Sequence, residues 1–550
     1  MGDSSDHGVA MTDHPLVTFI LCPRTDQHRN QNMNQRYTAL SIALFVGLLS
    51  AQAQISFGGQ PYGLNKSLMA EAPLVVMPSV NAEALKAEDE VRIQQGIKGP
   101  YRFGFNHATD ISTENSGAWT ELANGDRVWR VAIQCPEAYS INFEFHDYVV
   151  PAGAAVFVYN DLDEVLGSFT AESNPGHTEL GVTQLSGDRI TIEYVEPLAV
   201  RGQGRLRIGQ VTHAYRDIMG LTKGLGTSGS CNNNVICPEG DPWRAQIRSV
   251  AMITVGGSGL CTGQLLNNCN NDGVPYFLTA NHCLGGNNTW VFRFNWNSPT
   301  CATTTNGPTN QTVSGSTLKT NSAGSDVALL QLNTTPPASY NVFYTGWDKS
   351  GVAPTASTCI HHPDGDIKKI SFDNNAASMA NFSGAACWRI LNWEDGTTEP
   401  GSSGSGLWNQ NGLLIGQLYG GQASCSNNVN DYFGRFAVSY PLLTQWLGNC
   451  GDQLQGYPQA VGVNEASVMD RIQIAPNPTN GLFTVQLPSN MSKGARISVF
   501  DALGQLVIDQ NLTNGMERTT LDLTGRPDGL YFVSVFANGG KSVERLVLTR

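Results

Sequence analysis

The stretch of sequence that decides the fold is residues 275–283, which read Pro-Tyr-Phe-Leu-Thr-Ala-Asn-His-Cys. An apolar strand here ends in a histidine with a cysteine beside it. An aspartate begins a second strand at residues 323–332, Ala-Gly-Ser-Asp-Val-Ala-Leu-Leu-Gln-Leu. A serine lies in a glycine-rich loop at residues 399–406, Glu-Pro-Gly-Ser-Ser-Gly-Ser-Gly. Each peptide alone is a weak signal, and the three gain their meaning from their order along the chain.

The three peptides predict a nucleophile, a general base and an orienting carboxylate in Ser403, His282 and Asp326. A serine hydroxyl needs a histidine to accept its proton and a carboxylate to fix the tautomer of that ring. Because glycines let the loop turn tightly, we expect the N–H groups of Gly401 and Ser403 to form an oxyanion hole. The order histidine, aspartate, serine is that of the chymotrypsin class. The sequence therefore predicts an all-β fold with a trypsin-like double β-barrel around these residues.

Length, charge and cysteine usage give further information about the class of protein. A chain of 550 residues is too long for one ordinary domain, and its formal net charge of −13 argues against nucleic acid as a partner. Of its 12 cysteines, seven lie between residues 231 and 359, without the CxxC spacing of zinc ribbons. We therefore expect disulfides formed in an oxidising compartment, and no metal or cofactor.

The N-terminal part predicts export. Arg36 precedes an apolar run at residues 39–49, and Ala-Gln-Ala follows at residues 51–53. A charged segment, an apolar segment too short to span a bilayer and a small-x-small site are typical of a cleaved signal peptide. We expect Met33 to be the start, so that residues 1–53 are an upstream extension plus the signal peptide. The alternative is an uncleaved signal anchor.

The remaining chain divides into four predicted parts. Residues 54–223 form a β-rich pro-region, residues 224–450 the trypsin-like protease domain, residues 451–470 a linker, and residues 471–550 a C-terminal β-sandwich. Apolar or alternating runs between turns predict the strands of the two flanking parts. These runs are residues 128–133, 141–145, 155–159, 190–194, 482–487, 495–500 and 529–536.

The central region resembles lysyl endopeptidase, a family of secreted bacterial proteases of the chymotrypsin clan. The matching motifs are residues 229–231, 237–241, 276–283, 325–326, 360–363, 398–405, 416–418 and 431–435. The resemblance implies the same nucleophile, base and orienting carboxylate. It also implies three disulfides, which are Cys231–Cys425, Cys237–Cys301 and Cys261–Cys283. Outside that pattern we expect Cys359–Cys387 and, by elimination, Cys269–Cys450.

Substrate specificity depends on the acid in the substrate pocket. In trypsin-like pockets the acid lies six residues before the serine, where this chain has Thr397. The resemblance places the acid after the serine, at Asp431. There a buried carboxylate would pair with a lysine ammonium and exclude the broader guanidinium. Glu394, Asp395 and Glu399 are rival carboxylates, and a surface turn is the other interpretation of Asp431.

Aromatic residues near the predicted site leave two questions open. Tyr419 stands where the best-known members of the family have a histidine, and Phe382 is the candidate for the aromatic residue that accompanies it. Trp388 and Trp393, before the serine loop, line a substrate groove or belong to the core.

A group of histidines and aspartates has a superficial likeness to a metal cluster. It consists of His361, His362, Asp364 and Asp366, but no spacing fits a zinc site and the loop lacks the full calcium pattern. We expect these residues to support the structure or to lie at the edge of the pocket.

Activation is predicted to depend on removal of the pro-region. Ser402 precedes the nucleophile, where zymogen-activated trypsins have an aspartate that pairs with the new N-terminus. Lys223 lies in a Gly/Ser-rich junction, so cleavage after lysine would let the enzyme release itself.

The last 80 residues resemble the type IX secretion sorting domain. The motifs are Pro476-Asn-Pro-x-x-Gly481, residues 501–505, Gly529-Leu-Tyr531 and residues 541–550. The resemblance implies export across the outer membrane, followed by release or surface attachment. The alternative is an ordinary sandwich that binds carbohydrate or protein.

Together these patterns predict a secreted or cell-surface serine endopeptidase that cleaves after lysine. The alternatives are a trypsin-class peptidase of broader basic specificity and a catalytically inactive surface adhesin. We expect protein or peptide substrates and the secretion machinery as partners, no nucleic acid, no transmembrane segment in the mature protein, and a monomer.

Overall fold

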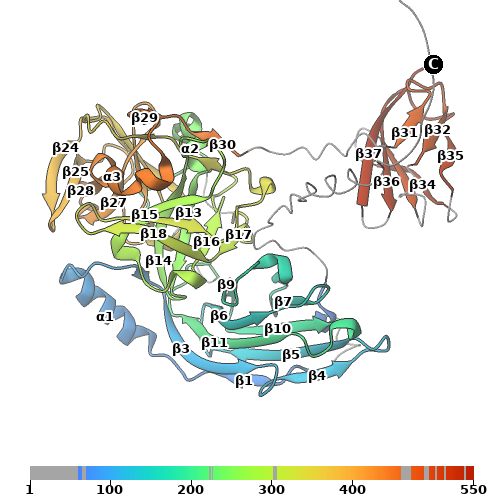
Figure 1. Ribbon diagram of the computed structural model, residues 1–550, viewed down its shortest axis with the longest axis horizontal. Helices are drawn as coiled ribbons and strands as arrows, with labels where there is room; N and C mark the ends of the chain where they lie inside the picture. Colours follow the sequence, from blue (N-terminus) through green and yellow to red (C-terminus); the bar gives the residue numbers. More distant parts are fainter. Residues whose placement is uncertain are drawn as a thin grey trace, which may run out of the picture. The chain divides into compact units, whose positions relative to one another are not determined.

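The computed structural model describes residues 60–64, 70–221, 225, 227–301, 306–459, 472–487, 495–501, 505–512, 516–537 and 540–550. The predicted signal peptide, Lys223 and residues 460–470 of the predicted linker lie outside these ranges. Strands dominate the described chain (Figure 1). No helix within the described ranges combines the length and the apolar character that crossing a bilayer requires.

Two sheets packed face to face make up the N-terminal part. Their strand orders are β1-β5-β10-β7-β8, with β4 beside β5, and β3-β11-β6-β9. Residues of both sheets, among them Trp129, Phe143 and Tyr194, form one buried core, so this part is a β-sandwich. Its strands are β1 (Leu74–Val76), β3 (Gly104–Ser112), β4 (Ala118–Glu121), β5 (Arg127–Gln134), β6 (Ser140–Val149), β7 (Ala155–Asn160), β8 (Val165–Phe169), β9 (Leu180–Ser186), β10 (Arg189–Glu196) and β11 (Arg205–Ala214). The predicted β-rich character is confirmed.

A helix that the strand pattern did not predict lies between β1 and the other strands of this sandwich. Helix α1 (Ala82–Gln94) begins after Asn81, whose side chain accepts a hydrogen bond from the Ala84 N–H at 3.0 Å. The helix is followed by Gly96, which has a φ of +66° that favours glycine. The chain then reaches β2 (Tyr101–Arg102), which pairs with a strand of the central region. Three short 3₁₀ turns complete this part, at Tyr62–Leu64, Ala171–Ser173 and Leu198–Val200.

The first sheet of the central region has the order β17-β16-β13-β14-β15-β19-β18, with β2 added to β14. It encloses its own core, which includes Phe277, Phe292 and Tyr344. Its strands are β13 (Val250–Val255), β14 (Gly259–Leu266), β15 (Tyr276–Ala280), β16 (Val291–Phe294), β17 (Thr312–Ser314), β18 (Ser316–Ser322) and β19 (Val327–Leu332).

The second central sheet has the order β12-β23-β22-β26-β27-β28-β25-β24, joined at its side by β21 and β29. Trp388, Ile390 and Phe433 belong to its core. Its strands are β12 (Asn233–Asn234), β21 (Trp347–Asp348), β22 (Ser357–His361), β23 (Lys369–Asp373), β24 (Ser378–Phe382), β25 (Ala385–Asn392), β26 (Gly406–Asn409), β27 (Leu414–Gly421), β28 (Val429–Arg435) and β29 (Gln453–Leu454). β20 (Phe343–Tyr344) pairs with β30 (Tyr457–Pro458).

A third cluster joins the two central sheets, because it contains Leu266 of the first and Trp408 of the second. Helix α3 (Phe436–Leu447) packs into it, and the remaining helical turns are α2 (Arg244–Ile247), Pro238–Trp243, Asn281–Cys283, Asn287–Thr289, Ala338–Tyr340 and Pro363–Gly365. This is the double β-barrel architecture that the sequence predicts, and the fold prediction is confirmed.

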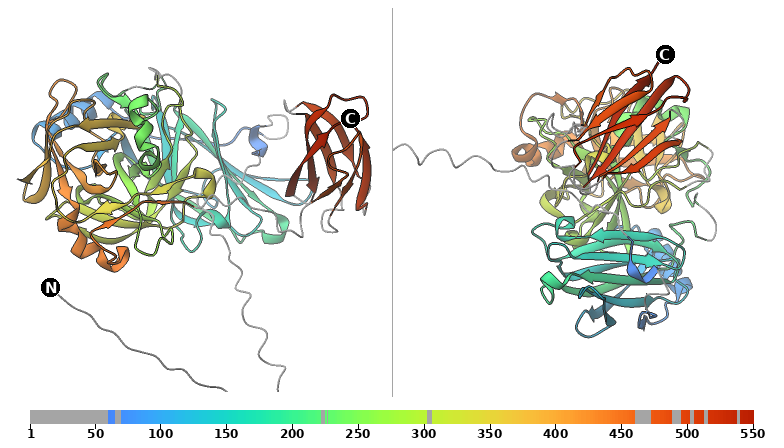
Figure 2. Two further views of the ribbon diagram at one scale, coloured as in Figure 1. Left: turned by 90° about the horizontal axis from the view of Figure 1, so that it is seen from above. Right: turned by 90° about the vertical axis from the view of Figure 1, so that its right-hand side faces the viewer.

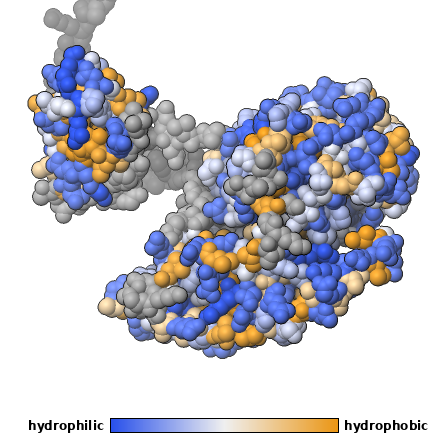
Figure 3. Space-filling view, turned by 180° about the vertical axis from the view of Figure 1, so that it is seen from behind, coloured by the Kyte–Doolittle hydropathy of each residue, from blue (hydrophilic) through white to orange (hydrophobic). Residues whose placement is uncertain are grey.

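The C-terminal part is a second sandwich, drawn in red in Figure 2. Its sheets have the orders β31-β32-β35 and β34-β33-β36-β37, around a core that includes Phe483, Val499 and Val533. Its strands are β31 (Gln473–Ala475), β32 (Leu482–Gln486), β33 (Arg496–Asp501), β34 (Leu506–Asn511), β35 (Arg518–Asp522), β36 (Gly529–Ala537) and β37 (Gly540–Leu548). On the face drawn in Figure 3, hydrophobic residues lie in small groups among hydrophilic ones.

Four disulfides cross-link the central region. They are Cys231–Cys425, Cys237–Cys301, Cys261–Cys283 and Cys269–Cys450. The expected Cys359–Cys387 bridge is wrong, because both thiols are free and buried. Cys359 lies on β22 and Cys387 on β25, and β26, β27 and β28 separate these strands in the sheet. Four strand spacings amount to about 19 Å along the sheet, whereas a disulfide joins Cα atoms less than about 7 Å apart.

Candidate active site

His282 is positioned by a strand pair and held by a buried acid. It lies in the turn after β15, which pairs with β19 at the end where Asp326 begins that strand. The Nδ1 atom of His282 lies 2.8 Å from Oδ2 of Asp326, and the His282 main-chain N–H donates to Oδ1 at 3.0 Å. Asp326 is only 2% exposed. An imidazole held in this way carries its proton on Nδ1 and leaves Nε2 as an acceptor.

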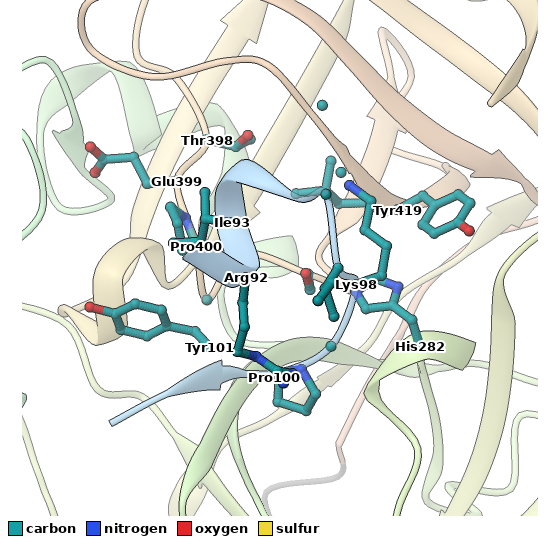
Figure 4. A pocket seen from close by; sticks show the side chains of 18 of the residues that line it. Arg92, Ile93, Lys98, Pro100, Tyr101, His282, Thr398, Glu399, Pro400 and Tyr419 are labelled. Atoms are coloured by element: carbon teal, nitrogen blue, oxygen red, sulfur yellow. The ribbon is translucent and has the colours of Figure 1, made fainter. Parts of the chain in front are cut away.

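The loop of Ser403 docks against the strand beside His282. The Thr262 N–H of β14 donates to the Ser403 carbonyl at 2.8 Å, and Thr262 follows Cys261. Cys261 is bonded to Cys283, which is the neighbour of His282. His282 and Ser403 line the same cavity, of about 530 Å³ (Figure 4). The structure thus brings together the three residues that the sequence predicts as a triad.

The serine loop has a backbone that needs glycine. Gly401 has a φ of +95°, and a Cβ atom there would lie 2.9 Å from the His362 carbonyl oxygen. A Cβ atom at Gly404 would lie 2.2 Å from Oγ1 of Thr279. Across the described part of the chain, the N–H groups of Gly401 and Ser403 have no protein acceptor. They are therefore available to a ligand oxygen.

His361 supports this loop, in keeping with the structural role expected for the histidine and aspartate group. It is fully buried, with Nδ1 2.8 Å from Oγ of Ser402 and Nε2 3.1 Å from Oγ of Ser371. Burial lowers the pKa of His361 to about 3, so the ring is neutral and bridges two hydroxyls. His362 lies 2.9 Å, by its Nδ1, from the Asp366 carbonyl oxygen. Each histidine thus has a hydrogen bond inside the fold, and Nε2 of His362 has no partner among the described residues.

Asp431 lies inside the same cavity, on β28. It is 1% exposed, and its Oδ2 accepts hydrogen bonds from Nε1 of Trp393 at 2.8 Å and Oγ1 of Thr398 at 2.6 Å. Burial raises its pKa to about 6, against the opposing effect of these hydrogen bonds. Asp431 is therefore a buried acid that is mostly ionised at neutral pH.

A glycine keeps space open above this carboxylate. Gly421 of β27 pairs with Asp431 of β28, and a Cβ atom at Gly421 would lie 2.1 Å from Oδ1. Any larger residue at this position would collide with the acid. The alternative interpretation of Asp431 as a surface turn residue is wrong, because the side chain is buried within a sheet.

The rival carboxylates have other partners. Glu399 accepts hydrogen bonds from the Gly229 N–H at 2.9 Å and from Asn232 at 2.8 Å. Glu399 also lines the cavity, but its carboxylate points away from Lys98 in Figure 4. Asp395 accepts from Asn233 at 2.6 Å. Glu394 is exposed and accepts from the Asn374 N–H at 2.5 Å.

Aromatic side chains form one wall beside His282. The ring of Tyr419 stacks on that of His282, with centroids 5.5 Å apart and planes inclined by 27°. The ring of Phe382 meets Tyr419 edge to face at 5.3 Å, so the structure brings this candidate to the site. Trp388 is buried and donates to the Ile415 carbonyl oxygen, which makes it a core residue. Trp393 is also buried, and by its bond to Asp431 it helps to form the pocket.

Two regions of the chain match families of known proteins. Residues 225–434 match the family described as lysyl endopeptidase, C-terminal domain, and residues 473–549 match the secretion system C-terminal sorting domain. The lysyl endopeptidase of Pseudomonas aeruginosa is 33% identical over 369 residues, which cover 60% of this chain and 77% of that protein.

Similar solved structures include a Glu endopeptidase and human heparin binding protein. The Glu endopeptidase is 18% identical, with a TM-score of 0.28 over 40% of this chain and 97% of its own. Human heparin binding protein is 16% identical, with a TM-score of 0.28 over 38% of this chain and 94% of its own.

Proposed function

The chain belongs to the lysyl endopeptidase family, and from this premise we propose that it cleaves peptide bonds on the carboxyl side of lysine. It is a serine endopeptidase, secreted or held at the cell surface, with a type IX sorting domain at its C-terminus. The finer proposal concerns the triad and the lysine pocket, which we assign to residues of this chain.

One observation carries the choice of lysine: a buried carboxylate, Asp431, lies in the cavity that His282 and Ser403 also line. A lysine ammonium is a compact charge that a single buried carboxylate pairs well, whereas a guanidinium needs a wider, fork-shaped set of acceptors. Thr397, at the position of the acid in trypsin-like pockets, supplies no charge. Trp393 and Thr398 hold Asp431 in place through Oδ2.

In the proposed mechanism, the Nε2 atom of His282 accepts the proton of the Ser403 hydroxyl as its oxygen attacks the carbonyl carbon after lysine. Asp326 holds the ring through Nδ1 and stabilises the imidazolium that forms. The Gly401 and Ser403 N–H groups bind the oxyanion of the tetrahedral intermediate. His282 then gives its proton to the leaving amine, and water hydrolyses the acyl-enzyme in a second cycle of the same steps.

The same specificity would govern maturation. We assign residues 1–53 to an upstream extension with a signal peptide, residues 54–223 to a pro-region, 224–450 to the protease domain, 451–470 to a linker and 471–550 to the sorting domain. Cleavage after Lys223 would separate the pro-region from the protease domain. We also propose a monomer as the working form.

Two measurements on the secreted protein test the proposal. A fluorophosphonate probe should label the wild-type protein and should not label Ser403→Ala, which should also accumulate uncut at the junction. Wild-type enzyme should cleave a lysine peptide at least about 100-fold faster than its arginine counterpart, because a pocket for a compact ammonium excludes a guanidinium. Equal rates on the two peptides would establish broader basic specificity instead, and normal maturation of Ser403→Ala would exclude self-processing.

A further inference from the structure

The segment that follows α1 and ends with β2 crosses the mouth of the proposed active site. Residues 96–102 line the same cavity as His282, Ser403 and Asp431. In Figure 4 the side chain of Lys98 extends alongside His282 and Tyr419. We call residues 96–102 the strap. The strap belongs to the predicted pro-region, so a part of the chain outside the protease domain closes the cavity on one side.

The strap is anchored at its C-terminal end by backbone pairing. Tyr101 and Arg102 form an antiparallel ladder with Leu260 and Gly259 of β14. The next residue, Phe103, is fully buried in a cluster with Leu260, Met252 and other residues of both parts of the chain. The backbone pairing and the burial of Phe103 therefore fix this end of the strap to the protease domain.

A buried acid fixes the strap to the rest of the N-terminal part. Asp89 of α1 accepts hydrogen bonds from Arg102 at 2.6 Å, Arg216 at 2.9 Å and the Tyr215 hydroxyl at 2.8 Å. Asp89 is 6% exposed, so these charge-assisted bonds lie largely out of water. The strap is consequently tied to α1 by the ion pair of Arg102 with Asp89 and to β14 by backbone pairing.

The charged end of Lys98 lies at the rim of the pocket, against an aromatic wall. Its Nζ is 5.0 Å from the ring centroid of Phe382 and 5.9 Å from that of Tyr419. A Cβ atom at Gly420 would lie 2.8 Å from Nζ, so the absence of a side chain there makes room for the ammonium. Distances of this size to aromatic rings are typical of cation–π contacts.

The charges around Lys98 are those of the proposed catalytic machinery. Partial burial of the ammonium lowers the pKa of Lys98, while the charges of Asp326 and Asp431 raise it. In turn, Lys98 lowers the pKa of Asp431. A substrate lysine that enters this cavity would meet a like charge already in the field of Asp431. It would also find the edge of β14 at Gly259 and Leu260 occupied by β2.

We propose that the strap, residues 96–102, is an intramolecular inhibitor of the protease domain, and that Phe382, Tyr419 and Gly420 form the subsite that holds its lysine. The inference rests on the proposed function, because it takes the cavity with Asp431 as the place where a substrate lysine binds. Lys98 as a whole residue remains exposed, so the contact is one that can open, and dissociation of the pro-region after its cleavage would make the opening permanent.

The test uses the full chain with Ser403→Ala, which cannot cut itself, and a fluorescent peptide that contains one lysine. Peptide affinity is measured by anisotropy for the intact chain and for the same chain after wild-type enzyme has cut it and both the pro-region and the added enzyme have been removed. If the open form is a tenth of the intact population or less, the intact chain should bind at least about 10-fold more weakly than the cut chain.

Two variants of the intact chain test the contribution of Lys98. Lys98→Ala and Lys98→Gln should each strengthen peptide binding about 5-fold, the size expected from the loss of two partly exposed cation–π contacts. Lys86→Ala is the matched control, because Lys86 lies on α1 and pairs with exposed Glu83, and it should leave the affinity unchanged. Equal affinity of intact and cut chains, or equal effects of the Lys98 and Lys86 variants, would overturn the proposal that the strap is an inhibitor.

A norleucine version of the peptide separates the two proposals. A cut chain that prefers lysine to norleucine supports the lysine pocket. A cut chain that binds both peptides equally contradicts the pocket but not the strap, which is then judged on the same ratio of intact to cut affinity with either peptide.

Discussion

Asp431→Asn removes one charge from the proposed lysine pocket and changes little else. Asparagine has the shape of aspartate, and its carbonyl oxygen accepts hydrogen bonds as Oδ2 does from Trp393 and Thr398. The side chain is 1% exposed, so water does not compensate for the missing charge. The substitution therefore tests the ion pair with a substrate lysine rather than the integrity of the pocket.

The size of the effect follows from the burial of the pair. Loss of one partner of a buried, hydrogen-bonded charge pair costs about 2–5 kcal/mol. A value of about 3 kcal/mol corresponds to a loss of roughly 150-fold in kcat/KM for a lysine substrate. A substrate with methionine in place of lysine makes no ion pair, so its kcat/KM should change by less than about 3-fold.

Initial rates on matched lysine and methionine peptides measure both values. Glu394→Gln is the control, because Glu394 is a rival carboxylate that is exposed and bonded to the Asn374 N–H. It should leave the lysine rate unchanged. A lysine preference that survives in Asp431→Asn, or an equal loss in Glu394→Gln, would refute the assignment of the pocket acid.

Two further predictions concern pH and the disulfide beside the proposed base. Burial raises the pKa of Asp431 to about 6 in the intact chain, and only its ionised form binds the ammonium. The ratio of kcat/KM for a lysine peptide to kcat/KM for a matched methionine peptide should therefore fall with decreasing pH through this range, because every step that the two peptides share cancels in the ratio. The ratio for Asp431→Asn should not depend on pH, and an equal fall in this variant would contradict the prediction. Replacing Cys261 and Cys283 with alanine opens a cross-link of sequence separation 22, which in the chain-entropy model stabilises the fold by about 3 kcal/mol. Thermal unfolding in a Ser403→Ala background should show a lower Tm, and an unchanged Tm would show that the cross-link adds nothing.

Local patterns in the sequence were sufficient for the architecture. The runs at residues 128–133 and 482–487 became β5 and β32. In β32 the burial alternates along the strand, so one buried face leaves a period of two in the sequence. β5 is buried on both faces and is therefore a nearly continuous apolar run. Helix α1 was not anticipated, since its exposed, highly charged residues carry no apolar stripe. The expected Cys359–Cys387 bridge failed because spacing along the chain does not report how many strands separate two residues in a sheet.

Some features of the candidate site could likewise be predicted from the sequence, and others could not. The order of His282, Asp326 and Ser403, each in its own type of strand or loop, is a property of short peptides, and so is the absence of an acid at Thr397. Only the folded chain decides which carboxylate faces the cavity. Asp431 is buried beside Trp393, Thr398 and Gly421. The carboxylate of Glu399 instead accepts hydrogen bonds from Gly229 and Asn232.

Two further features of the site cannot be predicted from any short peptide of the sequence. His361 bridges two serine hydroxyls that lie 10 and 41 residues from it in sequence. Lys98 reaches Phe382 and Tyr419 from a separate part of the chain. Chemical identity and local order are written in the sequence, whereas burial, charge pairing and the occupation of a cavity arise between residues that become neighbours only when the chain folds.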